Sequence, residues 1–123
     1  MIKYTKIGAL AAMLSVVLGA FGAHALKDKL TSDMMDVYET GVQYHMFHAV
    51  AILLVALLIE RLPRQRLALW AARLLLAGIV LFSGSLYALA LSGMDALGAI
   101  TPLGGVAFIA GWICLALAAR PLK

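Results

Sequence analysis

Four long apolar runs fill most of this 123-residue chain, and they constrain its fold more than any other feature. Apolar residues make up 64% of the sequence, and the charged residues lie almost entirely between the runs. A helix of about 20 apolar residues spans the roughly 30 Å hydrocarbon core of a bilayer. Lipid also restricts spanning backbone to helices or closed barrels, and barrel-like alternation is missing here. The sequence predicts an all-α integral membrane bundle with short loops, one transmembrane domain over residues 1–123. The predicted spans are 7–25, 41–60, 70–91 and 97–119.

Basic residues gather at one end of the predicted bundle. Four spans put both termini on one side, which carries eight of the ten Lys and Arg residues: Lys3, Lys6, Arg61, Arg64, Arg66, Arg73, Arg120 and Lys123. The positive-inside rule then predicts a cell (inner) membrane protein with both termini cytoplasmic. Trp70 and Trp112 fall near the same boundary, where indoles are favoured. The positive charge indicates contact with anionic membrane lipids, so we expect lipid partners and no nucleic acid.

Residues 31–41 precede the second span and have a helical pattern of their own. A Thr-Ser pair at the start can cap a helix, and Met34, Tyr38 and Gly41 then share one face. Two interpretations are open. The segment is either an amphipathic helix on the outer membrane surface that bends at Gly41, or a solvated helical extension of the second span.

Pro102 constrains the start of the fourth span in a similar way. Proline lacks a backbone donor and disfavours a helical conformation at the preceding Thr101. The fourth helix therefore either begins here, with proline in its first turn, or is broken here, as in transporters that bind ions at unwound helices. Because Pro102 lies only five residues beyond Leu97, we favour the first interpretation.

Small residues recur at four-residue spacing on three of the predicted helices. They are Ala11, Ser15, Gly19 and Ala23 in the first span, Gly84 and Ala88 in the third, and Ala107 and Gly111 in the fourth. Small residues let helix backbones approach closely in lipid, where packing replaces the hydrophobic effect. We expect these faces to pack within the chain. A seam in a homo-oligomer or in a larger membrane complex is the alternative.

Polar side chains concentrate in the outer half of the predicted bundle. A helix rises 1.5 Å per residue, which puts His48 near the bilayer midplane and His45 one turn further out. The candidates for a ligand site or polar cluster are His24, Gln43, Tyr44, His45, His48, Ser83, Ser85, Tyr87 and Thr101. Such groups are costly in lipid unless they face one another, so we expect them to converge.

Three interpretations of this cluster compete. We favour interhelical hydrogen bonds that join the helices at modest energy per contact. The second is a proton relay or a pocket for a lipid or quinone head group. The third is a metal or catalytic site, in which His45 and His48 ligate jointly and His24 adds a third nitrogen. No carboxylate lies near these histidines within the spans, so the metal is unknown, no cofactor is firmly implied and no catalytic residue is assigned.

Four segments of the chain resemble a known family. They are GAFGAHAL (19–26), TGVQYHMFHA (40–49), LFSGSLY (81–87) and ITPLGGVAFIAGW (100–112), in this order. Together they resemble the small four-helix membrane proteins of domain-of-unknown-function family four-two-three, the YgdD/YwdK-like proteins, which also have small eukaryotic transmembrane relatives. The resemblance covers essentially the whole chain. It implies a four-helix fold and a bacterial inner-membrane location, but no reaction.

Three classes of function are therefore compared. A non-enzymatic structural, assembly or lipid-interacting role is favoured, because no soluble domain and no nucleophile–base pair is found. A small transporter or channel is the first alternative, although all six acidic residues lie in loops or at helix ends. Only His45 and His48 would then titrate inside the spans. A lipid, quinone or metal site on the outer-half histidines is the second alternative, and an enzyme is the less expected outcome.

Overall fold

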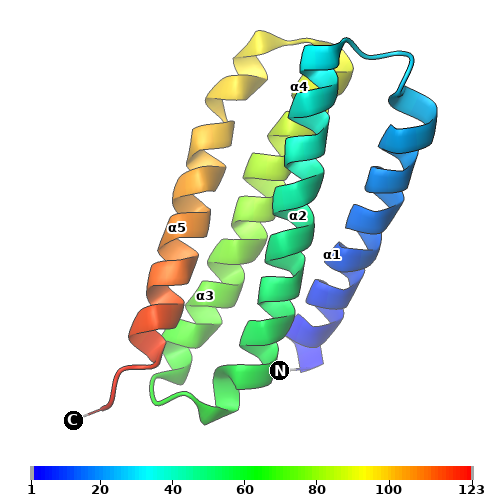
Figure 1. The fold of residues 1–123 in the computed structure, drawn as a ribbon. Helices are drawn as coiled ribbons and strands as arrows, with labels where there is room; N and C mark the ends of the chain where they lie inside the picture. The colour runs from blue at the N-terminus through cyan, green and yellow to red at the C-terminus, as the bar shows by residue number, and fades with distance from the viewer. Residues whose placement is uncertain (1, 123) are drawn as a thin grey trace.

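The computed structural model describes residues 2–122, and within that range it is entirely helical (Figure 1). The first helix is α1 (Ile2–Phe21), which continues as a π-helical segment, η1 (Gly22–Leu26). The second is α2 (Ser32–Leu58), which ends in a 3-10 turn (Ile59–Arg61). The third runs through α3 (Gln65–Gly78), a π-helical segment η3 (Ile79–Ser83) and α4 (Gly84–Ser92). A 3-10 turn (Asp95–Ala99) then leads into α5 (Thr101–Ala118).

Within residues 2–122, four helical segments are long and apolar enough to cross a membrane. They are Ile2–Leu26, Ser32–Arg61, Gln65–Ser92 and Asp95–Ala118. Each helix begins before the first residue of the corresponding predicted span. The chain is thus an all-helical bundle of four apolar helices.

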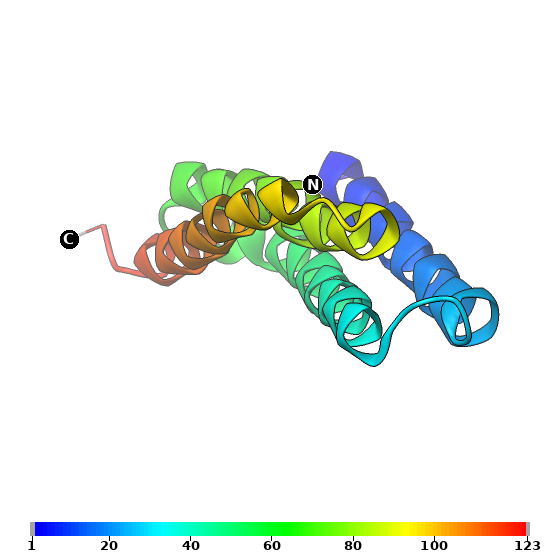
Figure 2. The ribbon, with the colours of Figure 1, turned by 90° about the horizontal axis from the view of Figure 1, so that it is seen from above.

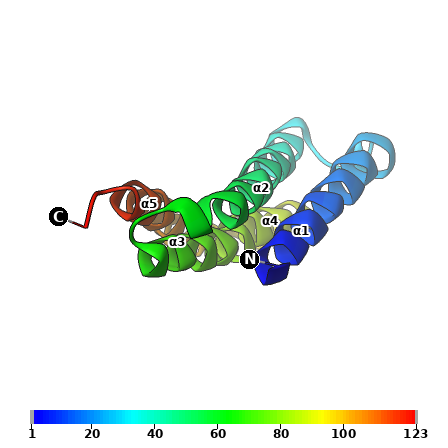
Figure 3. The same cartoon turned by 90° about the horizontal axis from the view of Figure 1, so that it is seen from below.

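The helices stand in a row. The third helix and α2 lie in the middle, α1 packs along α2, and α5 packs along α3 and η3. Seen from above and from below, α1 and α5 lie at opposite edges (Figures 2 and 3). Along the helix axes, the start of α1 and the end of α5 lie at the same end of the bundle, at the bottom of Figure 1. The backbone N–H of Arg64 donates to the carbonyl of Ala118 at 3.1 Å and ties α3 to α5 at that end.

Close packing joins α1 to α2 along a stripe of small residues. Ser15 is fully buried, Ala11 and Gly19 are half-buried, and Ala23 is exposed. The stripe continues through Gly22 and not Ala23, because residues three, four and seven apart share a helix face and Ser15, Gly19, Gly22 and Leu26 follow that spacing. A Cβ on Gly22 would overlap the Tyr38 ring, so the ring packs here because position 22 has no side chain.

A second close interface joins the third helix to α5. Gly111 packs against Leu75, and Ala107 is buried. The predicted small pair of the third span faces outward instead, since Ala88 is exposed and a Cβ on Gly84 would meet no atom within 4 Å. The π-helical segment η3 rotates α4 relative to α3. For that reason other positions of α4 face the neighbouring helices.

The segment at residues 31–41 is a continuous part of α2. Thr31 caps the helix by accepting a hydrogen bond from the Met34 N–H at 3.1 Å. The surface-lying helix with a bend at Gly41 is therefore wrong, and the helical extension is right. The apolar face of this extension is not solvated, since Tyr38 is 1% exposed and packs with Leu26 of η1. A larger residue would not fit easily at position 41, because the Tyr87 ring lies 3.0 Å from where the Cβ would be.

The fourth span is not broken at its proline. Thr101 begins α5, and Pro102 lies in the first turn, where its missing N–H costs nothing. Before this turn, α4 is capped at its C-terminus by Gly93, whose φ of 72° is the only positive value among residues 2–122. Its N–H donates to the Leu89 carbonyl at 2.8 Å, as expected of a glycine that ends a helix.

Candidate functional site

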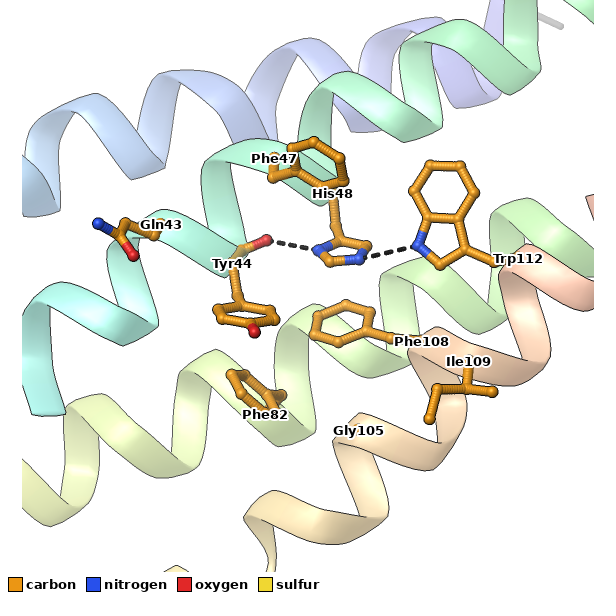
Figure 4. Close-up of a pocket in the computed structure, with 9 residues that line it drawn as sticks. All are labelled: Gln43, Tyr44, Phe47, His48, Phe82, Gly105, Phe108, Ile109 and Trp112. Carbon is orange, nitrogen blue, oxygen red and sulfur yellow. Dashed lines mark hydrogen bonds between the residues drawn. The ribbon is translucent and has the colours of Figure 1, made fainter.

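A cleft opens between α2 and α5, with η3 as its floor (Figure 4). Its volume is about 630 Å³, within the range of about 300–1,000 Å³ that is usual for small-molecule sites. The lining residues are Gln43, Tyr44, Phe47, His48, Phe82, Gly105, Phe108, Ile109 and Trp112. We call this feature the α2–α5 cleft. No charged side chain is among these described lining residues.

Aromatic rings from three helices meet in this cleft. The Tyr44 ring lies 4.5 Å from the Phe82 ring, and Phe82 lies 5.4 Å from Phe108, measured between centroids. The imidazole of His48 stacks on Phe108 at 3.6 Å with an angle of 13° between the planes. Phe47 covers the other side of His48 at 5.2 Å. Aromatic pairs at such distances add stability beyond their buried area, so these rings hold the walls of the cleft in place.

His48 is hydrogen-bonded at both ring nitrogens and links α2 to α5 through Nε2 (Figure 4). The indole Nε1–H of Trp112 can only donate, and it lies 3.1 Å from His48 Nε2, which therefore accepts. The proton of the neutral ring must then lie on Nδ1, which donates to the Tyr44 carbonyl at 2.8 Å. His48 is 4% exposed. Both nitrogens are occupied, so its role in this geometry is to position Trp112 and Phe108.

His45 faces a different neighbour from His48. Its Nδ1 lies 2.8 Å from the hydroxyl of Tyr87 on α4. Its Nε2 is buried, and it has no hydrogen-bond partner among residues 2–122. The two histidines are three residues apart on α2, yet one is bonded to α4 and the other to α5.

The predicted serines and threonine also join helices. The Ser83 hydroxyl donates to the Gly41 carbonyl at 2.7 Å and links η3 to α2. Ser85 donates to the Phe82 carbonyl at 2.8 Å. The Thr101 hydroxyl therefore donates to Ser85 Oγ at 2.5 Å and links α5 to α4.

The structure brings most of the predicted polar residues to helix–helix contacts, but it does not bring together the three histidines of the metal interpretation. His24 is exposed in η1, because it lies midway between Gly22 and Leu26, the two residues of this segment that are buried. Among residues 2–122, no group of three His, Cys, Asp or Glu side chains is placed to hold a metal ion. The indole of Trp112 lies in the cleft and donates to His48.

Comparison with known proteins identifies the family. The family described as "Protein of unknown function (DUF423)" matches residues 18–105. The UPF0382 membrane protein YwdK of Bacillus subtilis is 52% identical over 113 residues, which are 92% of this chain and 92% of the relative. The UPF0382 inner membrane protein YgdD of Escherichia coli is 42% identical over 118 residues, 94% of this chain and 87% of the relative.

The chain belongs to the DUF423 family.

Like its relatives, this DUF423 protein is a membrane protein. No solved structure matches it. The relatives' names state a membrane location and no activity. The α2–α5 cleft is therefore interpreted from its own residues.

Six cleft residues were not among the predicted site residues of this DUF423 protein: Gly105, Ile109 and four aromatic residues. Phe47, Phe82, Phe108 and Trp112 contribute most of the aromatic surface of the cleft. In a membrane helix an aromatic side chain has the same hydropathy whether it faces lipid or a cleft, so hydropathy gave no signal. The spacing of Gly105, Phe108 and Trp112 did contain one, because residues three, four and seven apart share a helix face.

Proposed function

We propose that this protein binds a membrane lipid in the α2–α5 cleft, in a structural, non-enzymatic role. The observation that carries the proposal is a cleft of about 630 Å³ with apolar and aromatic walls in the side of an apolar helix row. In a bilayer, the molecules that reach such an opening are lipids. The described lining offers no carboxylate, amine or thiol, and His48 is bonded at both ring nitrogens. These features favour binding over catalysis.

Adjacent glycines on α5 allow a direct test of lipid binding. A Cβ on Gly105 would meet only the edge of the Phe82 ring, 3.9 Å away, so Gly105→Leu fills the cleft without a backbone clash. Gly84→Leu is the matched control, because Gly84 has open space around it and does not line the cleft. The measurement is native mass spectrometry of each protein released from nanodiscs that contain a polar lipid extract of bacterial membrane.

We expect the unmodified protein and Gly84→Leu to retain a bound lipid, and Gly105→Leu to lose it. Both leucines add the same apolar side chain to a helix that faces lipid. A loss confined to Gly105→Leu therefore reports on the cleft and not on general contact with lipid. Equal retention by all three proteins would overturn the proposed function.

We further propose that the protein lies in the cell inner membrane with both termini in the cytoplasm. This is supported by the basic residues of the described chain, most of which lie at the end of the bundle where α1 starts and α5 ends, whereas Lys27 and Lys29 lie at the opposite end. It is also supported by the name of the Escherichia coli relative, an inner membrane protein.

Thiol labelling tests this orientation. In a Cys114→Ser background, which removes the single native cysteine, we expect Asp28→Cys to react with a membrane-impermeant maleimide in right-side-out vesicles. Arg120→Cys is expected to react only after the vesicles are permeabilised. The reverse pattern would mean that the termini face outward.

A further inference from the structure

We infer that the ligand of the α2–α5 cleft is a lipid with an uncharged, planar ring as its head, and that the Tyr44 hydroxyl donates a hydrogen bond to an acceptor on this ring. The inference rests on the proposed function and specifies its ligand. Four observations support it: the absence of charge in the cleft, the depth of Tyr44, the unpartnered state of its hydroxyl and the aromatic walls.

The first observation is the lack of charge. The described residues that line the cleft include no Lys, Arg, Asp or Glu. The bonds of His48 to Trp112 and to the Tyr44 carbonyl require a neutral imidazole. A phosphate, carboxylate or ammonium head would therefore enter a site without a counter-charge, which is strongly unfavourable away from water. A neutral head meets no such penalty.

The second observation is depth. Tyr44 lies five residues past Glu39, the last charged residue at the outer end of α2, which is about 7 Å along the helix axis. In the other direction the next charged residue is Glu60, about 24 Å away. The Tyr44 side chain is thus within the apolar part of α2. A ligand head that reaches it must be soluble in the hydrocarbon layer.

The third observation is an unused donor at that depth. The Tyr38 hydroxyl donates to the Leu18 carbonyl at 2.5 Å, and the Tyr87 hydroxyl is bonded to His45. The Tyr44 hydroxyl and the Gln43 amide make no hydrogen bond to any residue between 2 and 122. A polar group without a partner is costly in lipid. A ligand with a carbonyl or hydroxyl acceptor would supply that partner to Tyr44.

The shape of the walls favours a ring over a saturated chain. Tyr44 is 43% exposed, and it lies beside Phe82 and Phe108 in the cleft (Figure 4). A planar π-system gains from contact with such rings through offset or edge-to-face geometry. A saturated chain gains only dispersion from them. The aromatic walls therefore favour binding of a ring-shaped head group, while the tail of the lipid extends through the side opening into the bilayer.

The test uses the fluorescence of Trp112, which lines the cleft. Trp70→Phe removes the only other tryptophan and leaves Trp112 as the reporter in detergent-solubilised full-length protein. The probe is a benzoquinone with a short isoprenyl tail, which quenches indole emission. The competitors are a saturated alcohol with the same number of heavy atoms and a short-chain phosphatidylglycerol.

We expect saturable quenching of Trp112 by the benzoquinone, with the alcohol and the phosphatidylglycerol each displacing it at least about tenfold more weakly. Tyr44→Phe is expected to raise the dissociation constant of the benzoquinone about five- to tenfold, through loss of one hydrogen bond. Tyr4→Phe, on the far part of α1, is the control and should leave it unchanged. Gly105→Leu should abolish the saturable phase.

The outcomes separate this inference from the proposed function. If Gly105→Leu removes the bound lipid in mass spectrometry but the benzoquinone does not quench saturably, the inference is wrong and the cleft holds an acyl chain. The inference is also wrong if Tyr44→Phe binds the probe as the unmodified protein does, or if phosphatidylglycerol competes equally well. If Gly105→Leu removes neither the lipid nor the quenching, both proposals fall.

Discussion

Gly104→Ala is expected to lower the free energy of unfolding by about 3 kcal/mol, at the upper end of the usual cost of overpacking. A Cβ at this position would overlap the backbone of Phe82 in η3, and a backbone cannot move aside as a flexible side chain can. The bond from Thr101 to Ser85 sits one turn away and would be strained by any separation of α5 from the third helix. The measurement is unfolding of the purified protein in one detergent, by heat or denaturant.

The neighbouring glycine provides the control for this prediction. Gly105→Ala places its methyl group 3.9 Å from the Phe82 ring, which is an ordinary contact. Alanine is also favoured over glycine within a helix by about 1 kcal/mol, so stability should hold or rise. Equal effects of the two alanines would show that α5 does not pack against η3 as described.

Tyr38→Ala is the second substitution with a large expected effect, a loss of about 3 kcal/mol. The Tyr38 ring is 1% exposed and lies against Gly22, and its hydroxyl is bonded to the Leu18 carbonyl on α1. Removing the ring leaves a cavity between α1 and the first turns of α2. Tyr38→Phe keeps the ring and loses the hydrogen bond, so it should cost about 1 kcal/mol.

The Tyr38 pair of variants is measured by the same unfolding assay. Met34→Ala is a suitable comparison, because that side chain lies on the same extension of α2 but is only half-buried. A small effect of Tyr38→Ala, close to that of Met34→Ala, would contradict the packing of residues 32–41 on α1. It would favour a segment that lies free of the rest of the protein.

The fold class followed directly from hydropathy, because a helix in lipid needs a continuous apolar run and this requirement leaves a clear pattern. The start of α2 did not follow. Residues 31–41 have the alternation of polar and apolar faces that a surface helix also has, and only the position of Gly22 and Leu26 shows that the apolar face is covered by protein. Periodicity identifies an apolar face but not what packs on it.

The candidate site was predicted in part for a similar reason. Tyr44 and His48 were found because polar groups inside a span are rare and costly. The three-residue spacing of His45 and His48 suggested joint ligation, but the neighbouring helices offer Tyr87 to one and Trp112 to the other. The two π-helical segments left no sequence signal, although each changes the register that spacing arguments assume.

The arrangement of the helices in a row has a consequence for how this protein is held in shape. Each helix contains an apolar window of 18 residues. The share of its residues that is buried within the chain is 44% in the second helix and 39% in the third, but 17% in the first and in the fourth. Most residues of these two apolar windows are therefore half-buried or exposed, and in a bilayer their outward sides contact acyl chains. Contacts between acyl chains and these two helices therefore contribute to the free energy of unfolding, which should depend on how ordered the chains of the bilayer are. The stability of the protein should then differ between detergents of different tail length, mainly because their tails contact α1 and α5.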